Sequence, residues 1–274
     1  MIIAKLVVRG LAAAVFSLAT LPAHAQPAAA PPSAAQPPAA QQPFEPVTGQ
    51  AGKDVIWVPT PQATVDAMLE LAKLTPKDYL IDLGSGNGIT VITAAKRGAT
   101  AHGVEFNPDM VELSRRLAKE ANVAEKATFS QGDLFQADLS KATVVTLFLL
   151  PDINRRLRPS LLELPPGTRV VSNTFDMGDW EADEKANAQC TTSWCNALLW
   201  IVPAKAAGTW RLGSETLLLT QKYQMLEGTL GSAPISAGRL TGDEIAFTAN
   251  GRSYKGRVTG DTMTGEGWTA TRSQ

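Results

Sequence analysis

The chain has 274 residues, with 25 lysines and arginines against 26 aspartates and glutamates, so its formal net charge is −1. This balance excludes a generally basic nucleic-acid-binding protein as the first interpretation. A hydrophobic content of 44% excludes wholesale disorder, and two cysteines with two histidines are too few for a disulfide scaffold or a histidine-based metal centre. Composition therefore favours a globular enzyme or binding protein, and we predict no metal site.

The first 25 residues have the pattern of a secretory signal peptide. Lys5 and Arg9 supply positive charge, an apolar run follows over residues 10–21, and Ala23-His24-Ala25 resembles a cleavage site. The apolar run is shorter than the roughly 20 residues that span a bilayer. We therefore expect export, with a periplasmic location and no stable membrane span after cleavage; the alternative is a buried N-terminal helix. Residues 26–43 contain only Pro, Ala, Gln and Ser, which predicts a disordered linker.

Residues 54–205 alternate between strand-like and helix-like patterns. Thr60 is predicted to cap a first helix that begins at Pro61, and Pro108 is predicted to begin a later one. The predicted strands are residues 79–83, 101–105, 127–131, 143–150, 168–175 and 197–202. Further helices are predicted over residues 89–97 and 151–164. Strands that alternate with helices predict an α/β fold whose parallel sheet is covered on both faces.

A glycine-rich turn follows the first strand, in Asp82-Leu83-Gly84-Ser85-Gly86-Asn87-Gly88. Glycines allow close approach of a ligand to the backbone, and the helix that follows offers free N–H groups. Glu105, at the end of the next strand, is placed to accept both hydroxyls of a ribose. A glycine turn alone is a weak signal, because many such turns only connect a strand to a helix.

Three details narrow the choice of nucleotide. The glycine spacing is G-x-G-x-G, not the G-x-G-x-x-G expected for a pyrophosphate. Asp82 would repel a diphosphate but can pair with a cationic amine, and Asp133 can accept a hydrogen bond from an adenine amino group. A ligand with adenosine, no phosphate and an ammonium tail satisfies all three details, and S-adenosylmethionine is such a ligand.

These motifs resemble those of the class I, seven-strand S-adenosylmethionine-dependent methyltransferases. The wider run, with Val58-Pro59-Thr60-Pro61 and residues 144–151, resembles the bacterial and mitochondrial protein-lysine methyltransferases. Their eukaryotic members act on the adenine nucleotide translocase and on the membrane-embedded ring protein of ATP synthase. The resemblance covers about residues 58–203 and implies a Rossmann-like sheet with strand order 3-2-1-4-5-7-6.

The resemblance also implies roles for individual residues. The residues expected to bind the cofactor are Asp82, Gly84, Ser85, Gly86, Gly88, Glu105, Phe106, Asn107, Asp133 and Leu134. Thr60, Leu150 and Pro151 would border the acceptor pocket. Some of these positions have a plainer alternative: Asp133 can cap the short helix after it, Thr60 caps its own helix, and Leu150-Pro151 can be only a strand-to-helix joint.

A lysine acceptor would have to lose a proton before methylation, since its free pKa is about 10.4. Desolvation or a nearby carboxylate can assist. The catalytic residues stay unknown, and Asp152 and Asp176 are weak candidates because loop aspartates are usually solvated. The expected partner is a protein lysine or a small-molecule acceptor, without nucleic acid. Two alternatives stay open: a small-molecule or lipid methyltransferase of the same fold, or a non-catalytic S-adenosylmethionine-binding envelope protein.

Cys190 and Cys195 lie in a polar loop, and in an exported protein a local disulfide between them is the plain interpretation. After Pro203 the composition changes. Residues 208–274 contain short alternating runs, separated by turns such as Thr241-Gly242-Asp243. These predicted strands are residues 215–223, 225–230, 236–240, 244–248, 252–258 and 263–268. This pattern predicts a small all-β domain, an antiparallel meander or barrel. This domain can select a partner, or it can only shield the edge of the α/β sheet.

Overall fold

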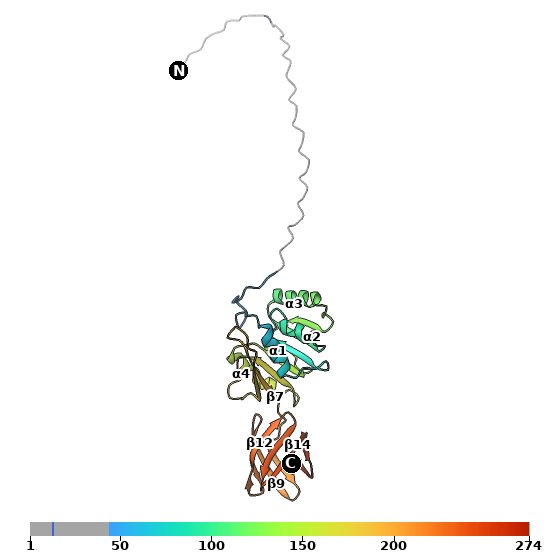
Figure 1. Cartoon of the computed structure of the whole chain (residues 1–274), viewed down its shortest axis with the longest axis vertical. Helices are drawn as coiled ribbons and strands as arrows, with labels where there is room; N and C mark the ends of the chain where they lie inside the picture. Colours follow the sequence, from blue (N-terminus) through green and yellow to red (C-terminus); the bar gives the residue numbers. More distant parts are fainter. Residues whose placement is uncertain (1–12, 14–43, 274) are drawn as a thin grey trace, which may run out of the picture. The chain divides into compact units, whose positions relative to one another are not determined.

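The computed structural model describes residues 44–273, together with Ala13 (Figure 1). The predicted linker, and all but one residue of the predicted signal peptide, lie outside the described residues. Within the described part of the chain, no helix combines the length and the apolar character needed to cross a membrane. The strands there form two sheets of different architecture, one of seven strands and one of nine.

The first sheet has the strand order β3-β2-β1-β4-β5-β7-β6. Its strands are β1 (Tyr79–Leu83), β2 (Thr100–Glu105), β3 (Ala127–Gln131), β4 (Val144–Leu147), β5 (Arg169–Asn173), β6 (Glu184–Asn187) and β7 (Asn196–Ile201). The first five strands pair in parallel, and β7 runs antiparallel to both β5 and β6. The predicted strand order is confirmed. Because the order reverses between β1 and β4, a crevice is expected at the carboxyl ends of these strands.

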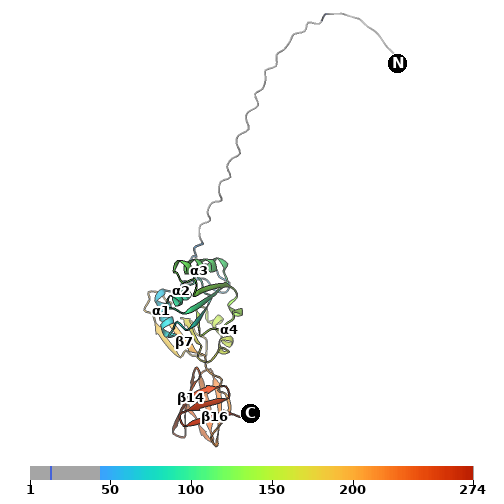
Figure 2. The same cartoon turned by 90° about the vertical axis from the view of Figure 1, so that its right-hand side faces the viewer.

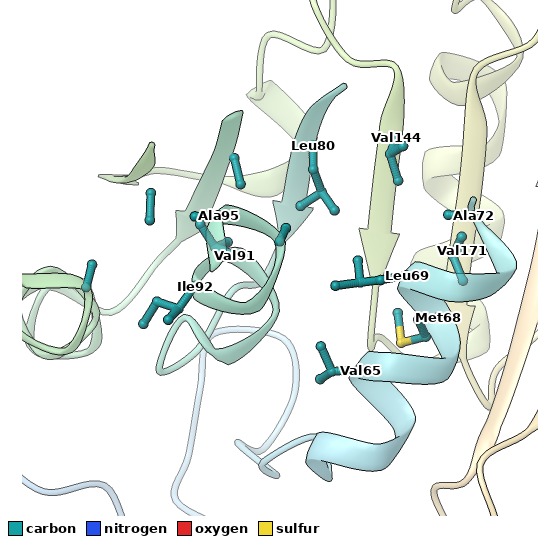
Figure 3. Close-up of a cluster of buried hydrophobic side chains, with 14 of the residues drawn as sticks. Val65, Met68, Leu69, Ala72, Leu80, Val91, Ile92, Ala95, Val144 and Val171 are labelled. Carbon is teal, nitrogen blue, oxygen red and sulfur yellow. The ribbon is translucent and has the colours of Figure 1, made fainter. Parts of the chain in front are cut away.

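Helices cover both faces of this sheet. They are α1 (Gln62–Leu71), α2 (Ile89–Lys96), α3 (Pro108–Glu120) and α4 (Pro151–Leu162). Figures 1 and 2 show α1, α2 and α3 side by side, with α4 apart from them. Leu80 of β1 packs into the same buried cluster as Val65 and Val91 (Figure 3), whereas its neighbour Ile81 packs with α4. Successive strand residues therefore face opposite apolar layers, which explains the nearly continuous apolar run in β1.

The start of α1 differs from the sequence prediction. Pro61 occupies the N-cap with φ −58° and ψ 140°, and no side chain caps the helix. The prediction that Thr60 caps this helix is therefore wrong, because Pro61 keeps an extended conformation and leaves Thr60 outside the helix. The prediction for α3 is correct: it begins at Pro108, and the Asn107 side chain accepts a hydrogen bond from the Asp109 N–H.

The C-terminal sheet closes into an antiparallel barrel. Its strands are β8 (Gly208–Leu212), β9 (Glu215–Lys222), β10 (Met225–Leu230), β11 (Ala233–Pro234), β12 (Ser236–Thr241), β13 (Glu244–Ala249), β14 (Arg252–Thr259), β15 (Thr262–Gly265) and β16 (Trp268–Arg272). Strand β9 pairs with both β8 and β10, which closes the ring, and β11 is a short addition to β10. Closure removes the exposed strand edges that an open sheet would present.

The sequence pattern misses two strands and joins parts of two others. It misses β6, whose Glu-Lys-Ala-Asn sequence is mostly solvent-exposed and lacks an apolar alternation. It also misses β8. The pattern predicts one strand over residues 263–268, but a turn at Glu266-Gly267 divides this run between β15 and β16.

Asp78 stabilises the end of the first sheet opposite the crevice, directly before β1. Its buried carboxylate accepts hydrogen bonds from Thr75 N at 2.7 Å and from Thr143 Oγ1 at 2.8 Å, and it pairs with Arg169. Burial raises the pKa of Asp78, but the hydrogen bonds from Arg169, Thr143 and Thr75 outweigh it, and the net pKa is lowered. The stabilisation is therefore full at neutral pH and is lost as the pH falls below 3.8.

We predict that Asp78→Asn lowers the free energy of unfolding by about 2–4 kcal/mol, because it leaves the Arg169 guanidinium without its buried partner. Urea unfolding at neutral pH measures the loss. Glu125→Gln, at an exposed position, is the control and should change stability by no more than about 0.5 kcal/mol. Equal stability of the two variants would contradict the role given to Asp78.

Candidate functional site

A cavity lies at the carboxyl ends of β1, β2 and β4, where the strand order reverses. Its lining includes nine of the ten residues predicted to bind a cofactor: Asp82, Gly84, Ser85, Gly86, Glu105, Phe106, Asn107, Asp133 and Leu134. Gly88 is outside the lining and forms the N-cap of α2. Of the predicted acceptor residues, Thr60 and Leu150 line the cavity and Pro151 does not. The structure therefore brings most of the predicted residues to one place.

The Asp82 carboxylate is the most deeply placed charge of the cavity. Asp82 is 6% exposed, and its Oδ1 accepts a hydrogen bond from Thr146 Oγ1 at 2.6 Å. The two residues are register partners on β1 and β4. Burial raises the pKa of Asp82 to about 7, against the lowering effect of the Thr146 hydroxyl, and nearby Glu105 adds to the rise. A cation bound beside this carboxylate would be strongly favoured.

Glu105 holds the glycine turn in place. One of its carboxylate oxygens accepts the Gly86 N–H and the other accepts the Asn107 N–H, each at 2.9 Å. A carboxylate has about four lone-pair sites, so two remain for a ligand. Glu105 therefore both shapes the turn and keeps the capacity to accept two ribose hydroxyls.

Two glycines are required by the packing of this turn. Gly88 has φ +77°, and a Cβ there would lie 2.7 Å from the Phe129 ring. A Cβ at Gly86 would lie 2.7 Å from Trp57 Nε1, and the Gly86 carbonyl accepts a hydrogen bond from Ser114 Oγ. Because a side chain at either position would overlap its neighbours, the turn keeps its present path only with glycine there.

The cavity fits the nucleoside that the sequence predicts. Ser85 Oγ is buried and has no hydrogen-bond partner among the described residues, and buried polar groups are almost always paired. The acids Asp82, Glu105 and Asp133 match an ammonium, a ribose and an adenine amine. A diphosphate would meet these same carboxylates and be repelled. This set of hydrogen-bond acceptors therefore suits S-adenosylmethionine and does not suit a dinucleotide.

Residues 50–60, the strap, form one wall of this cavity. Gly49 N and Trp57 N donate hydrogen bonds to Trp57 O and Gln50 O, and Ala51 bridges Ile56. The strap therefore folds back on itself and places Trp57 against the glycine turn. The strap is not predicted from the sequence, since most of it precedes the first predicted helix and has no periodic pattern.

Lys53 of the strap occupies the adenine end of the cavity. Its Nζ lies 2.6 Å from Asp133 Oδ2 and 5.1 Å from the centroid of the Phe106 ring. The hydrogen bond between the two groups raises the pKa of Lys53 and lowers that of Asp133. Asp133 also accepts a hydrogen bond from the Phe135 N–H, so it caps the short helix over Leu134–Gln136. This capping role is the alternative that the sequence left open. An adenine stacked on Phe106 and bonded to Asp133 would therefore have to share this space with Lys53.

The other end of the cavity is apolar and aromatic. Phe148, Phe175 and Trp194 line it together with Thr60 and Leu150. The two weak catalytic candidates lie elsewhere: neither Asp152 nor Asp176 is among the lining residues. Asp152 pairs with Arg155 one helical turn away, and Asp176 accepts the Gly178 N–H. The acceptor end therefore has no carboxylate from these loops.

A disulfide joins Cys190 to Cys195, directly after Trp194. The Trp194 carbonyl accepts a hydrogen bond from Thr64 Oγ1 of α1 at 2.8 Å, and its N–H donates to Thr192 Oγ1. The loop that presents Trp194 to the cavity is thus tied to itself and to α1. The sequence predicts the disulfide but not the position of Trp194 in the cavity lining.

Comparison with known proteins gives a consistent family. Residues 82–184 match the family model described as the ANTKMT methyltransferase domain. The chain is similar to a protein-lysine N-methyltransferase of Saccharolobus islandicus, with 43% identity over 47% of this chain and 83% of that protein. It is 35% identical to the adenine nucleotide translocase lysine N-methyltransferase of Mus musculus, over 43% of this chain and 52% of the relative. The chain thus spans about half the length of the mouse protein.

One solved structure supports the fold of the first sheet. It is an RNA methyltransferase from Salinibacter ruber in complex with S-adenosyl-L-homocysteine, 50% identical in sequence. The similarity covers 54% of this chain and 95% of that one, with a TM-score of 0.51.

The raised pKa of Asp82 gives a pH-dependent prediction. At pH 6 Asp82 is mostly protonated in the free protein, and the ammonium of S-adenosylhomocysteine favours the ionised form. We expect binding at about pH 6 to release a proton, and the affinity to rise with pH up to about 7 by at most tenfold per unit. Calorimetry in buffers of different ionisation enthalpy measures both effects. Asp82→Asn should remove them, and a pH-independent affinity of the unmodified protein would contradict the assignment.

The position of Lys53 gives a second prediction. If Lys53 competes with adenine for Asp133, Lys53→Ala should raise the affinity for S-adenosylhomocysteine by about twofold to fivefold, since an exposed ion pair is weak. The dissociation constant, measured by calorimetry at one salt concentration, tests this. Lys77→Ala, at an exposed position away from the cavity lining, is the control. A weaker affinity of Lys53→Ala would show instead that Lys53 contacts the cofactor.

Proposed function

The chain belongs to the class I S-adenosylmethionine-dependent methyltransferases, in the protein-lysine branch, and we propose that it methylates the side-chain amine of lysine in a protein. One observation carries the proposal: the crevice at the carboxyl end of β1 contains the buried carboxylate of Asp82, and its far end is apolar. The 43% identity to the protein-lysine N-methyltransferase of Saccharolobus islandicus supports lysine as the acceptor.

Each end of the cofactor has a residue suited to hold it. S-adenosylmethionine supplies a methyl group that its sulfonium has already activated, and the methyl passes to the amine nitrogen as its bond to sulfur breaks. We assign Asp82 to the ammonium of the cofactor, Glu105 to the ribose, and Asp133 with Phe106 to the adenine. The Ser85 hydroxyl, which lines the same cavity, adds a hydrogen-bond donor to these acceptors.

The chain's contribution to the reaction is alignment and desolvation. A displacement of this kind needs the nucleophile placed in line with the breaking bond, which a closed pocket provides. The acceptor amine must be neutral, and an apolar surrounding lowers the pKa of a lysine by disfavouring its charged form. Phe148, Phe175 and Trp194 supply such a surrounding. We therefore propose that desolvation, and not a carboxylate from Asp152 or Asp176, prepares the amine.

We also propose that the protein works outside the cytoplasm. The leader pattern of residues 1–25 supports export, and the disulfide between Cys190 and Cys195 suits an oxidising compartment. The acceptor would then be an envelope protein, and the cofactor would have to be supplied across the inner membrane.

RNA is the competing acceptor, because the Salinibacter protein is an RNA methyltransferase. The charges of the cavity disfavour it. Among the lining residues, Lys53 is the one lysine or arginine, and it is paired with Asp133. The acidic lining residues are Asp54, Asp82, Glu105 and Asp133. Nucleic-acid sites instead neutralise phosphates with several basic side chains.

The test is a transfer assay on the mature chain, residues 26–274, with methyl-labelled S-adenosylmethionine. Envelope proteins, total RNA and a lipid extract are offered in parallel. We expect label in protein, with mass spectrometry placing the methyl groups on lysine. Label in RNA or lipid would overturn the proposed acceptor, and absence of both transfer and cofactor binding would overturn the enzyme.

Asp82→Asn is the matched variant for this assay. Losing the charged partner should lower transfer at subsaturating cofactor by about tenfold or more. Asp109→Asn, an exposed acid in the first turn of α3 that does not line the cavity, should leave transfer unchanged. Equal activity of the two variants would contradict the assignment of Asp82.

A further inference from the structure

Residues 188–195, the disulfide loop, connect β6 to β7. Cys190 and Cys195 are bonded to each other, and the three residues that follow Cys190 are polar and exposed. Trp194, directly before Cys195, is partly buried and lines the cavity. The stretch between the two cysteines therefore has one apolar side chain, and that side chain belongs to the cavity wall.

A buried hydroxyl anchors the disulfide loop to α1. Thr64, in the first turn of α1, is 0% exposed, and its Oγ1 donates a hydrogen bond to the Trp194 carbonyl at 2.8 Å. The same oxygen lies 3.8 Å from Cys190 Sγ. The disulfide therefore lies beside the anchor, and it keeps Cys190 and Trp194 together against Thr64.

The contacts of Trp194 itself are weak by comparison with a covalent bond. Its ring centroid lies 5.8 Å from that of Phe148 and 5.5 Å from that of Phe175, and aromatic contacts of this kind are individually small. Its N–H donates to Thr192, which belongs to the same loop. Without the disulfide, the exposed residues of the loop regain the conformational freedom that ring closure removes. Cleavage of the disulfide therefore removes the strongest restraint on the position of Trp194.

The two sulfur atoms differ in exposure. Cys195 is 7% exposed, whereas Cys190 is only partly buried, so a reductant reaches Cys190 Sγ first. A thiolate of a small dithiol attacks this sulfur and Cys195 leaves as a thiolate; the second thiol of the reagent then displaces Cys190 and closes the reagent's own disulfide. The two cysteines take up the two protons that the reagent loses, so the chain gains two electrons and two protons.

We propose that the bond between Cys190 and Cys195 is a redox switch on one wall of the cavity. In the oxidised form Trp194 is held against α1 and covers the apolar end. In the reduced form the loop leaves α1, and the apolar end is open to water. Asp82 and Glu105 belong to other strands, β1 and β2, so the cofactor end keeps its shape in both forms. The inference goes beyond the proposed function, because it concerns the cavity wall and requires no methyl transfer.

Fluorine NMR on the mature chain labelled with 5-fluorotryptophan tests the switch. The six tryptophans include Trp180, Trp200 and Trp210, which are 0% exposed and serve as internal references. The Trp194 signal is assigned with Trp194→Phe. We expect dithiothreitol to move and sharpen the Trp194 signal while the reference signals stay in place, and reoxidation to restore it.

Three results of this experiment would overturn the proposal. One is an unchanged Trp194 signal when thiol titration finds two free thiols per chain. Another is a Trp194 signal that reoxidation does not restore. The third is loss of the reference signals on reduction, because it would show general unfolding and not release of one loop.

Two variants separate the disulfide from its anchor. Cys190→Ser combined with Cys195→Ser should show the reduced Trp194 signal at all times and no response to dithiothreitol; a signal at the oxidised position would overturn the switch. Thr64→Val keeps the shape of the side chain but removes the donor. With the disulfide intact, its Trp194 signal should move part of the way to the reduced position, and an unmoved signal would contradict the anchor.

The affinity for S-adenosylhomocysteine shows whether the effect is confined to one end of the cavity. It should differ by less than about twofold between the oxidised and reduced forms, because distant sites contribute nearly independently. Calorimetry with and without dithiothreitol measures the difference. A larger difference would contradict a switch that acts on the apolar end alone.

The switch and the proposed function can fail separately. If the Trp194 signal responds to reduction but neither form labels protein in the transfer assay, the switch stands and the function fails. If protein lysine is labelled but the signal is indifferent to reduction, the function stands and the switch fails. Where both stand, the oxidised form should label protein about twofold to tenfold faster, because loss of the ring exposes the acceptor amine to water. Equal rates would overturn the switch as a control of the reaction.

Discussion

The site depends on one buried carboxylate. Asp82 lies at the end of β1 with its side chain 6% exposed, and Thr146 of the neighbouring strand is its hydrogen-bonding partner. A buried acid without a cationic partner is costly to ionise, and its pKa of about 7 expresses this cost. A positively charged ligand relieves the cost, while a diphosphate would increase it. The carboxylate of Asp82 therefore determines that the crevice favours a positively charged ligand over a diphosphate.

The fold places this carboxylate where a nucleoside can reach it. The reversal of strand order between β1 and β4 opens the crevice, and Glu105 from β2 holds the glycine turn at its rim. The apolar layers on both faces keep the strands in register, so Asp82 and Thr146 remain opposite each other. At the opposite ends of the strands, Asp78 stabilises the sheet by pairing with Arg169. The packing that stabilises the sheet therefore also positions the residues of the site.

Much of this was predictable from the sequence, since parallel buried strands leave a strong signal. The run at residues 79–83 matches β1 to the residue, because a strand buried on both faces reads as an apolar segment between turns. The run at residues 127–131 matches β3 to the residue, and there buried and exposed residues alternate along the strand. Strand β6 was not predictable, because an exposed polar edge strand has no such pattern. The start of α1 was mispredicted because Pro61 took the N-cap position that the pattern gave to Thr60.

The residues of the site likewise differ in whether the sequence predicts them. Asp82 and Glu105 could be identified because they stand at the carboxyl ends of predicted strands, near glycines. Lys53 and Trp194 could not, because each reaches the cavity from an aperiodic segment whose path depends on tertiary contacts. The aromatic half of the cavity therefore emerges only when three distant segments are brought together.

The central claim is that the crevice binds a cationic sulfur nucleoside and not a diphosphate coenzyme. Competition calorimetry tests it directly: the protein is titrated with S-adenosylhomocysteine in the absence and presence of excess NAD. The account predicts the same affinity in both titrations and no heat from NAD alone. Displacement of S-adenosylhomocysteine by NAD, or tighter binding of NAD, would contradict it.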